Sequence, residues 1–276
     1  MIKLLRIEFK KILTYKVFWI LVGLYFLFLA SGILLAEFII NSNIESMNRR
    51  LPIPLPRVNL YFFPWIWQNI AFFATLRYML ILPATVIMIL VTNEFTFKTV
   101  RQNVINGMGR AEIITSKMLI ILLFSVIMTL FYAIGTIILG ISNTADVTPG
   151  LILQNISFIP GFFVTMLTFL VYALFFAFLL RNTGLAIAIF TLYTFIVEPI
   201  LYYFLKSPLV FENNISPYLP VNAVLRVTEY PSLQVLKMVS GIDLQTTVTW
   251  ETALLPVGYA ALMLVIIYRV MAKRDL

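Results

Sequence analysis

The sequence contains no cysteine and no histidine among its 276 residues. Without cysteine the chain forms no disulfide, offers no thiol chemistry and carries no signal of redox compartment. Without histidine it lacks a common metal ligand and the base that most often activates serine or cysteine nucleophiles. We therefore expect no catalytic residue, no bound metal and no enzyme activity in this chain.

Charged residues are scarce as well, at 12% of the chain against 61% hydrophobic residues and a mean hydropathy of +0.98. These values lie outside the range of ordinary globular domains. The apolar runs are long enough to cross about 30 Å of hydrocarbon as helices. They are continuously apolar instead of alternating, which excludes a transmembrane barrel. The sequence predicts an all-α integral membrane protein, a single transmembrane domain over 1–276, with six spans at about 17–40, 69–92, 118–141, 158–180, 185–205 and 253–271.

The net charge of +8 reflects an uneven distribution of basic residues. Lysine and arginine are concentrated at both ends of the chain and in the segment between the second and third spans, all on the side of the N terminus. Since basic residues favour the cytoplasmic side, we predict a multi-pass protein of a bacterial cytoplasmic (inner) membrane with both termini in the cytoplasm. We expect no nucleic-acid partner, because a basic soluble module is absent.

The chain also lacks a phosphate-binding loop. Gly135 and Gly140 have the spacing of the two loop glycines, but Ile141 and Ser142 follow where lysine and serine or threonine are needed. The pair also lies in the middle of the third predicted span. We therefore do not expect this chain to hydrolyse a nucleotide.

Two segments outside the spans carry membrane-surface patterns. Residues 1–16 combine an apolar stripe with lysines and predict an interfacial helix in the headgroup layer. The long loop 206–252 alternates turn signals with the apolar stretches 218–227 and 233–239. We interpret these stretches as short helices that dip into the outer leaflet.

Two short features predict local geometry within the bundle. Pro83 removes a backbone hydrogen bond inside the second span, which predicts a kink that is either tolerated or used as a hinge. Only four residues, Arg181 to Gly184, separate the fourth and fifth spans. These two helices should form a tight antiparallel hairpin.

The segment from Glu94 to Arg110, between the second and third spans, is the most informative part of the sequence. Its apolar residues recur at intervals of three and four and should share one face of a helix, namely Phe97, Val100, Val104 and Met108. Lys98 and Arg101 project elsewhere, and Gly107 and Gly109 supply backbone that ends a helix. The pattern predicts a short basic amphipathic helix that lies against another surface.

Two ionisable residues, Arg77 and Glu198, fall inside predicted spans, where charge is costly and is usually partnered. At 1.5 Å per residue both lie roughly 20 to 22 Å from the cytoplasmic end of their helices, so they could form an intramembrane pair. Such a pair either locks two helices together or lines a transport path. Glu37 is an alternative partner for Arg77.

The order of these parts resembles the membrane subunit, or permease, of type 2 ABC exporters. The shared features are the interfacial helix at 1–16, six spans, a cytoplasmic helix after the second span and a long outer loop before the sixth. The segment 94–110, continued to Lys117, is similar to the family's run of an acidic residue, threonine, a basic patch, glycine and Ser-Arg. Here Gly109 and Arg110 stand where Ser-Arg or Pro-Arg is commoner.

The resemblance implies a permease that works as a homodimer or heterodimer with separate ABC ATPase subunits, which would bind ATP and magnesium. The segment 94–110 would be the coupling helix. The implied ATPase-coupling residues are Glu94, Phe97, Lys98, Val100, Arg101, Val104, Gly107 and Arg110. An amphiphilic cargo is expected, with ATP-driven export by alternating opening of a pathway between the subunits.

Other interpretations of the sequence stay open. The helix at 94–110 could rest only on lipid headgroups. The chain could be a scaffold or anchor subunit that serves an ATPase-linked surface machine without transporting a substrate. A secondary transporter is less favoured, because inverted repeats and several midplane charges are missing.

Overall fold

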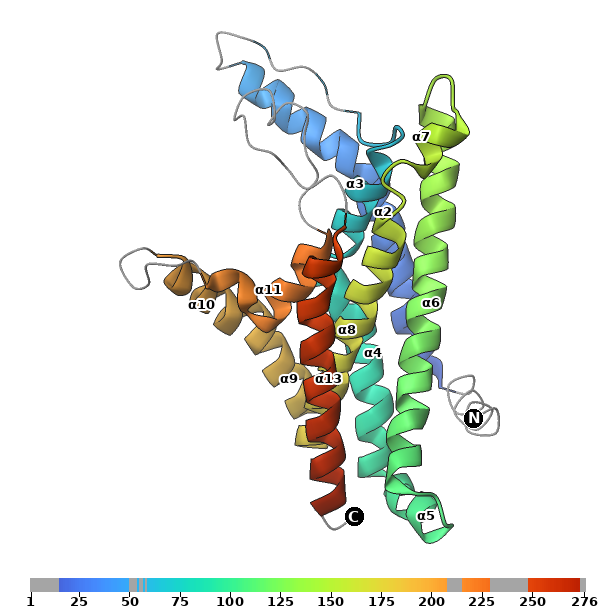
Figure 1. Cartoon of the computed structure of the whole chain (residues 1–276), viewed down its shortest axis with the longest axis vertical. Helices are drawn as coiled ribbons and strands as arrows, with labels where there is room; N and C mark the ends of the chain where they lie inside the picture. Colours follow the sequence, from blue (N-terminus) through green and yellow to red (C-terminus); the bar gives the residue numbers. More distant parts are fainter. Residues whose placement is uncertain are drawn as a thin grey trace.

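The computed structural model of the chain describes residues 15–49, 54, 57, 59–207, 215–228 and 248–273, and these form helices and connecting segments with no strand among them (Figure 1). The elements are α2 (Lys16–Asn48), α3 (Ile66–Ala74), α4 (Arg77–Thr96), α5 (Thr99–Ile105), α6 (Arg110–Asn143), α7 (Pro149–Leu153), α8 (Phe158–Leu180), α9 (Thr183–Leu192), the π-helix η1 (Tyr193–Val197), α10 (Glu198–Lys206), the 3₁₀-helix η2 (Ser216–Tyr218), α11 (Pro220–Leu225), the 3₁₀-helix η3 (Arg226–Thr228) and α13 (Trp250–Lys273).

Six helical stretches are long and apolar enough to cross a membrane, which confirms the predicted all-α class and the number of spans. Their bounds are Lys16–Asn48, Arg77–Thr96, Arg110–Asn143, Pro149–Leu180, Thr183–Lys206 and Trp250–Lys273. Residues 1–14 of the interfacial helix predicted at 1–16 lie outside the described residues, and so does the predicted outer stretch at 233–239.

Helix α8 forms the centre of the bundle and packs against α4, α6 and α13. Several of its large side chains are fully buried, including Phe162 and Phe169. Ala173 and Ala177, spaced by four residues, have no exposed surface. Small residues at this spacing allow neighbouring helices to approach closely, so α8 can be surrounded on several sides.

The second span is not the single helix over 69–92 that the sequence predicts. The chain leaves helical geometry at Leu76, whose φ is −55° and ψ is 143°, between α3 and α4. Thr75 ends α3 by donating its hydroxyl to the carbonyl of Ala71 at 2.8 Å, and its Oγ1 lies 2.7 Å from that of Thr228. The break thus depends on a contact with a residue far along the chain, which local apolarity does not reveal.

The fourth and fifth spans form the predicted tight hairpin. Helix α8 ends at Leu180, and Arg181 adopts a left-handed conformation with φ of 53°. Asn182 then caps α9 by accepting a hydrogen bond from the Leu185 amide at 3.0 Å. A left-handed residue followed by an asparagine N-cap reverses the chain in very few residues.

The loop before the last span contributes to the core. Helix α11 and the following η3 pack against α8 and α13, while the preceding η2 packs against α10 and α11. Val221, Val224 and Val227 have no exposed surface. The structure confirms that 218–227 contains short helical segments, and their position in the outer leaflet stays a prediction.

The two ends of the bundle differ in their connections (Figure 1). Helix α5 and the C-terminal end of α13 lie at one end, which we call the basal end. Helix α7 and the upper part of α3 lie toward the opposite end. The candidate functional residues divide between the basal end and the interior of the bundle.

Candidate functional site

Helix α5 is shorter than the predicted helix over 94–110 and is separated from α4. Helix α4 continues to Thr96, and Lys98 then adopts a left-handed conformation with φ of 56°. Helix α5 begins only at Thr99. Since a left-handed residue interrupts the helical phase, residues on the two sides of Lys98 no longer share a face.

The predicted apolar face is consequently divided. Val100 is 3% exposed, and Val104 and Met108 are partly buried against the core. Phe97 is 70% exposed. The prediction that all four residues share one face is wrong for Phe97, because the break at Lys98 turns it outward.

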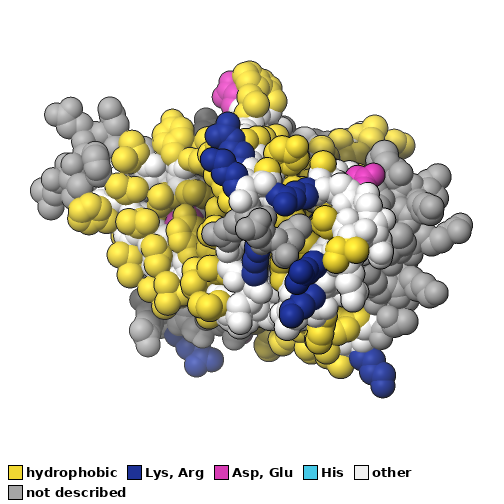
Figure 2. Space-filling model, turned by 90° about the horizontal axis from the view of Figure 1, so that it is seen from below, with side chains coloured by type: hydrophobic (Ala, Val, Ile, Leu, Met, Phe, Trp, Pro, Cys, Tyr) yellow, Lys and Arg dark blue, Asp and Glu magenta, His cyan; other side chains and the backbone are white. Residues whose placement is uncertain are grey.

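The outward surface of α5 and its preceding turn mixes large apolar and basic side chains. Phe97 and Ile105 are 70% and 74% exposed, and Lys98, Arg101 and Gln102 are exposed beside them. We call these five residues the basal knob. A space-filling view of the basal end shows lysine and arginine side chains gathered across this face, with apolar side chains beside them and few acidic ones (Figure 2).

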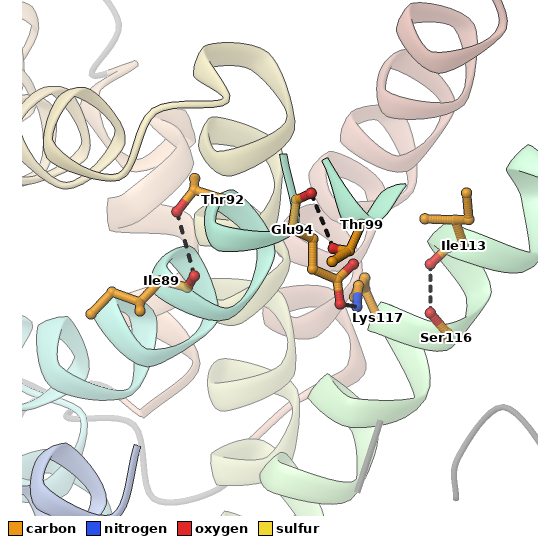
Figure 3. Close-up of polar contacts among 7 residues, drawn as sticks. All are labelled: Ile89, Thr92, Glu94, Thr99, Ile113, Ser116 and Lys117. Carbon is orange, nitrogen blue, oxygen red and sulfur yellow. Dashed lines mark hydrogen bonds and ion pairs between the residues drawn. The ribbon is translucent and has the colours of Figure 1, made fainter. Parts of the chain in front are cut away.

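A buried ion pair fixes the base of the basal knob (Figure 3). The Nζ atom of Lys117, on α6, lies 2.5 Å from Oε1 of Glu94, on α4, and their side chains are 3% and 10% exposed. Thr99 at the start of α5 donates its hydroxyl to the backbone carbonyl of Glu94 at 3.1 Å. Glu94 therefore faces the interior, where it joins α4, α5 and α6.

Two glycines and a glutamate form the turn that connects the C-terminal end of α5 to α6. Gly107 has φ of 89°, a value that favours glycine and that ends the segment as predicted. The Gly109 amide donates to Oε2 of Glu112 at 2.8 Å at the start of α6. These contacts turn the chain back into the bundle directly after α5.

Arg110 makes contacts within the protein. Its guanidinium donates to the backbone carbonyls of Met271, at 2.7 Å, and Ala272. Carbonyls at a helix C terminus lack partners within the helix and carry partial negative charge, so an arginine there is stabilising. Arg110 thereby joins the start of α6 to the end of α13.

A second polar cluster lies inside the bundle around Arg77, the first residue of α4. Its guanidinium donates to the Thr194 carbonyl at 2.7 Å and to Oδ1 of Asn222 at 2.8 Å. Thr194 belongs to the π-helix η1. A π-helix alters the regular backbone pairing, and this local change accompanies the presentation of the Thr194 carbonyl to Arg77.

Glu198 completes this cluster from the start of α10. It is fully buried, and its carboxylate accepts hydrogen bonds from the amides of Val221 at 3.0 Å and Asn222 at 2.6 Å. The side-chain amide of Asn222 also donates to Glu198 at 3.0 Å. Asn222 therefore bridges the two charged residues, and we call Arg77, Asn222 and Glu198 the bridged cluster.

The direct contact that the sequence suggests for Arg77 and Glu198 is replaced by this bridge, since no ion pair joins them among the described residues. Their proximity was predicted, but Asn222 was missed. A short helix that supplies two backbone amides and an asparagine to a buried carboxylate has no distinctive sequence pattern. Its only signals are Pro220 at the helix start and the apolar residues around Asn222.

Glu37, the alternative partner considered for Arg77, lies in a different environment. Its carboxylate accepts a hydrogen bond from the Leu60 amide at 3.3 Å, and its own amide donates to the Tyr61 hydroxyl at 3.3 Å. The Tyr61 hydroxyl donates to the carbonyl of Ile33. Burial raises the pKa of Tyr61 above its ordinary value of 10.0, which favours the protonated form that donates this bond.

The described residues contain no group of three or more acidic, histidine or cysteine side chains that could hold a metal ion. No family model matches the chain, and no curated protein is matched by its sequence. The functional argument therefore depends on the basal knob and the bridged cluster.

Proposed function

We propose that this chain is the permease subunit of an ATP-driven ABC exporter and that the basal knob docks on a separate ATPase. The observation that carries the proposal is the combination of an exposed, mixed apolar and basic surface with a buried, ion-paired base. Phe97 and Ile105 offer apolar area, while Lys98 and Arg101 offer positive charge. Such a surface suits a partner groove that has apolar walls and acidic residues at its rim.

The base of the knob supports a mechanical role. Because Lys117 and Glu94 pair between α4 and α6, displacement of α5 would move both helices together. A helix that only rested on lipid headgroups would have no need of this buried pair. We infer that force from an ATPase reaches the second and third spans through this connection.

The bridged cluster supports a pathway that changes shape within the membrane. It joins the broken second span to the π-helix of the fifth span and to α11. Helix breaks and π-helical turns are frequent at moving or functional sites. In the proposed cycle, motion of α4 would alter the contacts of Arg77, and the amphiphilic cargo would pass between two permease subunits.

The proposal is tested by purifying the tagged chain from its own cells and measuring which ATPase is recovered with it. We expect the wild type to recover an ATPase and the Phe97→Asp/Arg101→Asp variant to lose most of it. The Arg57→Asp variant is the control, because it reverses an exposed charge that pairs with Glu45 at the end of α2, far from α5. Recovery that is equal in all three proteins would exclude the knob as the docking surface.

A second readout separates an exporter from a non-transporting scaffold. With the ATPase bound, the purified complex in proteoliposomes should show ATP-dependent movement of an amphiphilic dye. A complex that hydrolyses ATP yet moves none of a panel of amphiphiles would support the scaffold function.

A further inference from the structure

An outward-facing groove runs between the basal halves of α6 and α13. It encloses about 480 Å³, and its lining includes Ile114, Thr115 and Met118 from α6 with Leu264, Val265 and Arg269 from α13. The two helices approach each other toward the basal end (Figure 1), where Arg110 joins them. This groove has no part in the proposed ATPase docking or in the bridged cluster.

The lining is almost entirely apolar and belongs to two predicted membrane spans. On α6 it extends from Ala111 to Met118, which corresponds to roughly 10 Å along a helix. Val265 and Tyr268 are 50% and 53% exposed, so the groove opens sideways toward the surrounding bilayer. Its length and apolar walls suit the part of a lipid acyl chain that lies next to the headgroup.

The charged residues at the basal mouth of the groove on α13 are basic, which favours a negatively charged lipid headgroup. Arg269 lines the groove and is exposed, and no carboxylate among the described residues forms an ion pair with it. Lys273 follows one turn later and is also exposed. On the α6 side the nearest acidic residue in sequence, Glu112, already accepts the Gly109 amide. The basal mouth of the groove therefore carries positive charge.

We propose that this groove is a binding site for an anionic phospholipid of the adjacent leaflet. One acyl chain would lie between α6 and α13, and the phosphate would contact Arg269. The Tyr268 hydroxyl and Lys273 would add polar contacts at the mouth. A lipid bound there would brace the two helices at the same level as the Arg110 contact to α13.

The absence of native cysteine makes a unique fluorescent probe available for the test. Leu262→Cys places a bimane label one turn from Val265, beside the groove but outside its lining, at a position that is 56% exposed. Leu192→Cys on α9 is the matched control. It is 51% exposed and lies as many residues from Arg181 as Leu262 lies from Lys273.

Each labelled protein is placed in phosphatidylcholine nanodiscs that contain a nitroxide-labelled phosphatidylglycerol or phosphatidylcholine. We expect the phosphatidylglycerol probe to half-quench the Leu262 label at about a fivefold lower mole fraction than the phosphatidylcholine probe. The Leu192 label should show no preference. Arg269→Gln should remove the preference, and Arg269→Lys should keep most of it.

Two outcomes would overturn the proposal. Equal quenching of the Leu262 label by both lipids would mean that the groove holds bulk lipid without headgroup selection. Quenching by neither lipid would mean that another protein surface, such as a second copy of the chain, covers the groove. An unchanged elution profile in size-exclusion chromatography verifies that the Arg269 variants remain folded.

Discussion

The two buried charge clusters of this protein hold their charges in different ways. Glu94 and Lys117 touch directly and join α4 to α6, two helices that are separated in the chain only by α5 and its turns. Arg77 and Glu198 are joined through Asn222 and bring together three distant segments. The direct pair makes a local clamp at the base of α5, whereas the bridged cluster makes a long-range connection that could be rearranged by exchange of hydrogen bonds. The direct pair is suited to transmitting motion between α4 and α6. The bridged cluster is suited to exchanging its hydrogen bonds when α4 moves.

The largest effect should come from the bridged cluster, through Glu198→Ala. This change leaves the backbone amides of Val221 and Asn222 and the side-chain amide of Asn222 without their buried acceptor, and it removes the negative charge that Asn222 connects to Arg77. We expect a loss of about 3–5 kcal/mol in the free energy of unfolding. The measurement is unfolding in mixed micelles with increasing SDS.

Glu45→Ala is the matched control for this measurement. Glu45 pairs with Arg57 at 2.6 Å, but the two side chains are 53% and 78% exposed. Exposed pairs contribute about 1 kcal/mol or less. If both variants lost the same small amount, the bridged cluster would contribute nothing beyond an exposed pair.

The direct clamp should show the next largest effect, because Lys117→Met leaves Glu94 buried without its cation. We expect a loss of about 3 kcal/mol. The double variant Glu94→Leu/Lys117→Met should recover much of that loss, since an apolar pair of similar size replaces a desolvated ion pair. A double variant as unstable as the sum of its single variants would show that the two residues do not interact.

The same variants of Glu94 and Lys117 separate a role in stability from a role in coupling ATP hydrolysis to transport. If the clamp transmits motion, the stable double variant should bind the ATPase normally and yet transport less cargo per ATP hydrolysed. Transport and ATP hydrolysis measured on the same proteoliposomes give this ratio. An unchanged ratio would restrict the clamp to a structural role.

Arg110→Gln should have a smaller effect, confined to the contact between α6 and α13. Loss of the guanidinium leaves the Met271 and Ala272 carbonyls without this donor, which should cost about 1 kcal/mol. Hydrogen exchange at the last turn of α13 should become faster, while exchange in α8 stays unchanged. Uniformly faster exchange across both helices would indicate a global loss of stability instead.

The smallest effect on stability should come from the basal knob. Phe97→Ala/Arg101→Ala removes exposed side chains and should change the free energy of unfolding by less than about 0.5 kcal/mol. The same variant should weaken recovery of the ATPase. A large loss of stability would show that these side chains support the fold and are not reserved for a partner.

The sequence predicted the spans well because continuous apolar runs of sufficient length determine them. It placed the end of the first span near residue 40, whereas α2 continues as helix to Asn48 through polar residues. Hydropathy marks the edge of the apolar part, and a helix can extend beyond it into a polar environment. The hairpin at Arg181 was predictable, since only a few polar residues separate two long runs.

The features that the sequence did not predict depend on tertiary contacts or on single backbone conformations. The break at Thr75 and Leu76 involves a contact with Thr228, and the bridge needs Asn222. The outward turn of Phe97 depends on the left-handed conformation of Lys98. None of these positions contains the glycine or proline that would mark a break, so helical periodicity continued through them.

The central claim, that the basal knob docks on an ATPase, is tested most directly by site-specific crosslinking in cells. A photoreactive phenylalanine analogue at Ile105, which is 74% exposed, should crosslink to a protein that contains a phosphate-binding loop. The same analogue at Tyr203, which is 73% exposed on α10, should not give that product. Crosslinks from Ile105 to lipid alone, with no ATPase among the products, would contradict the proposed function.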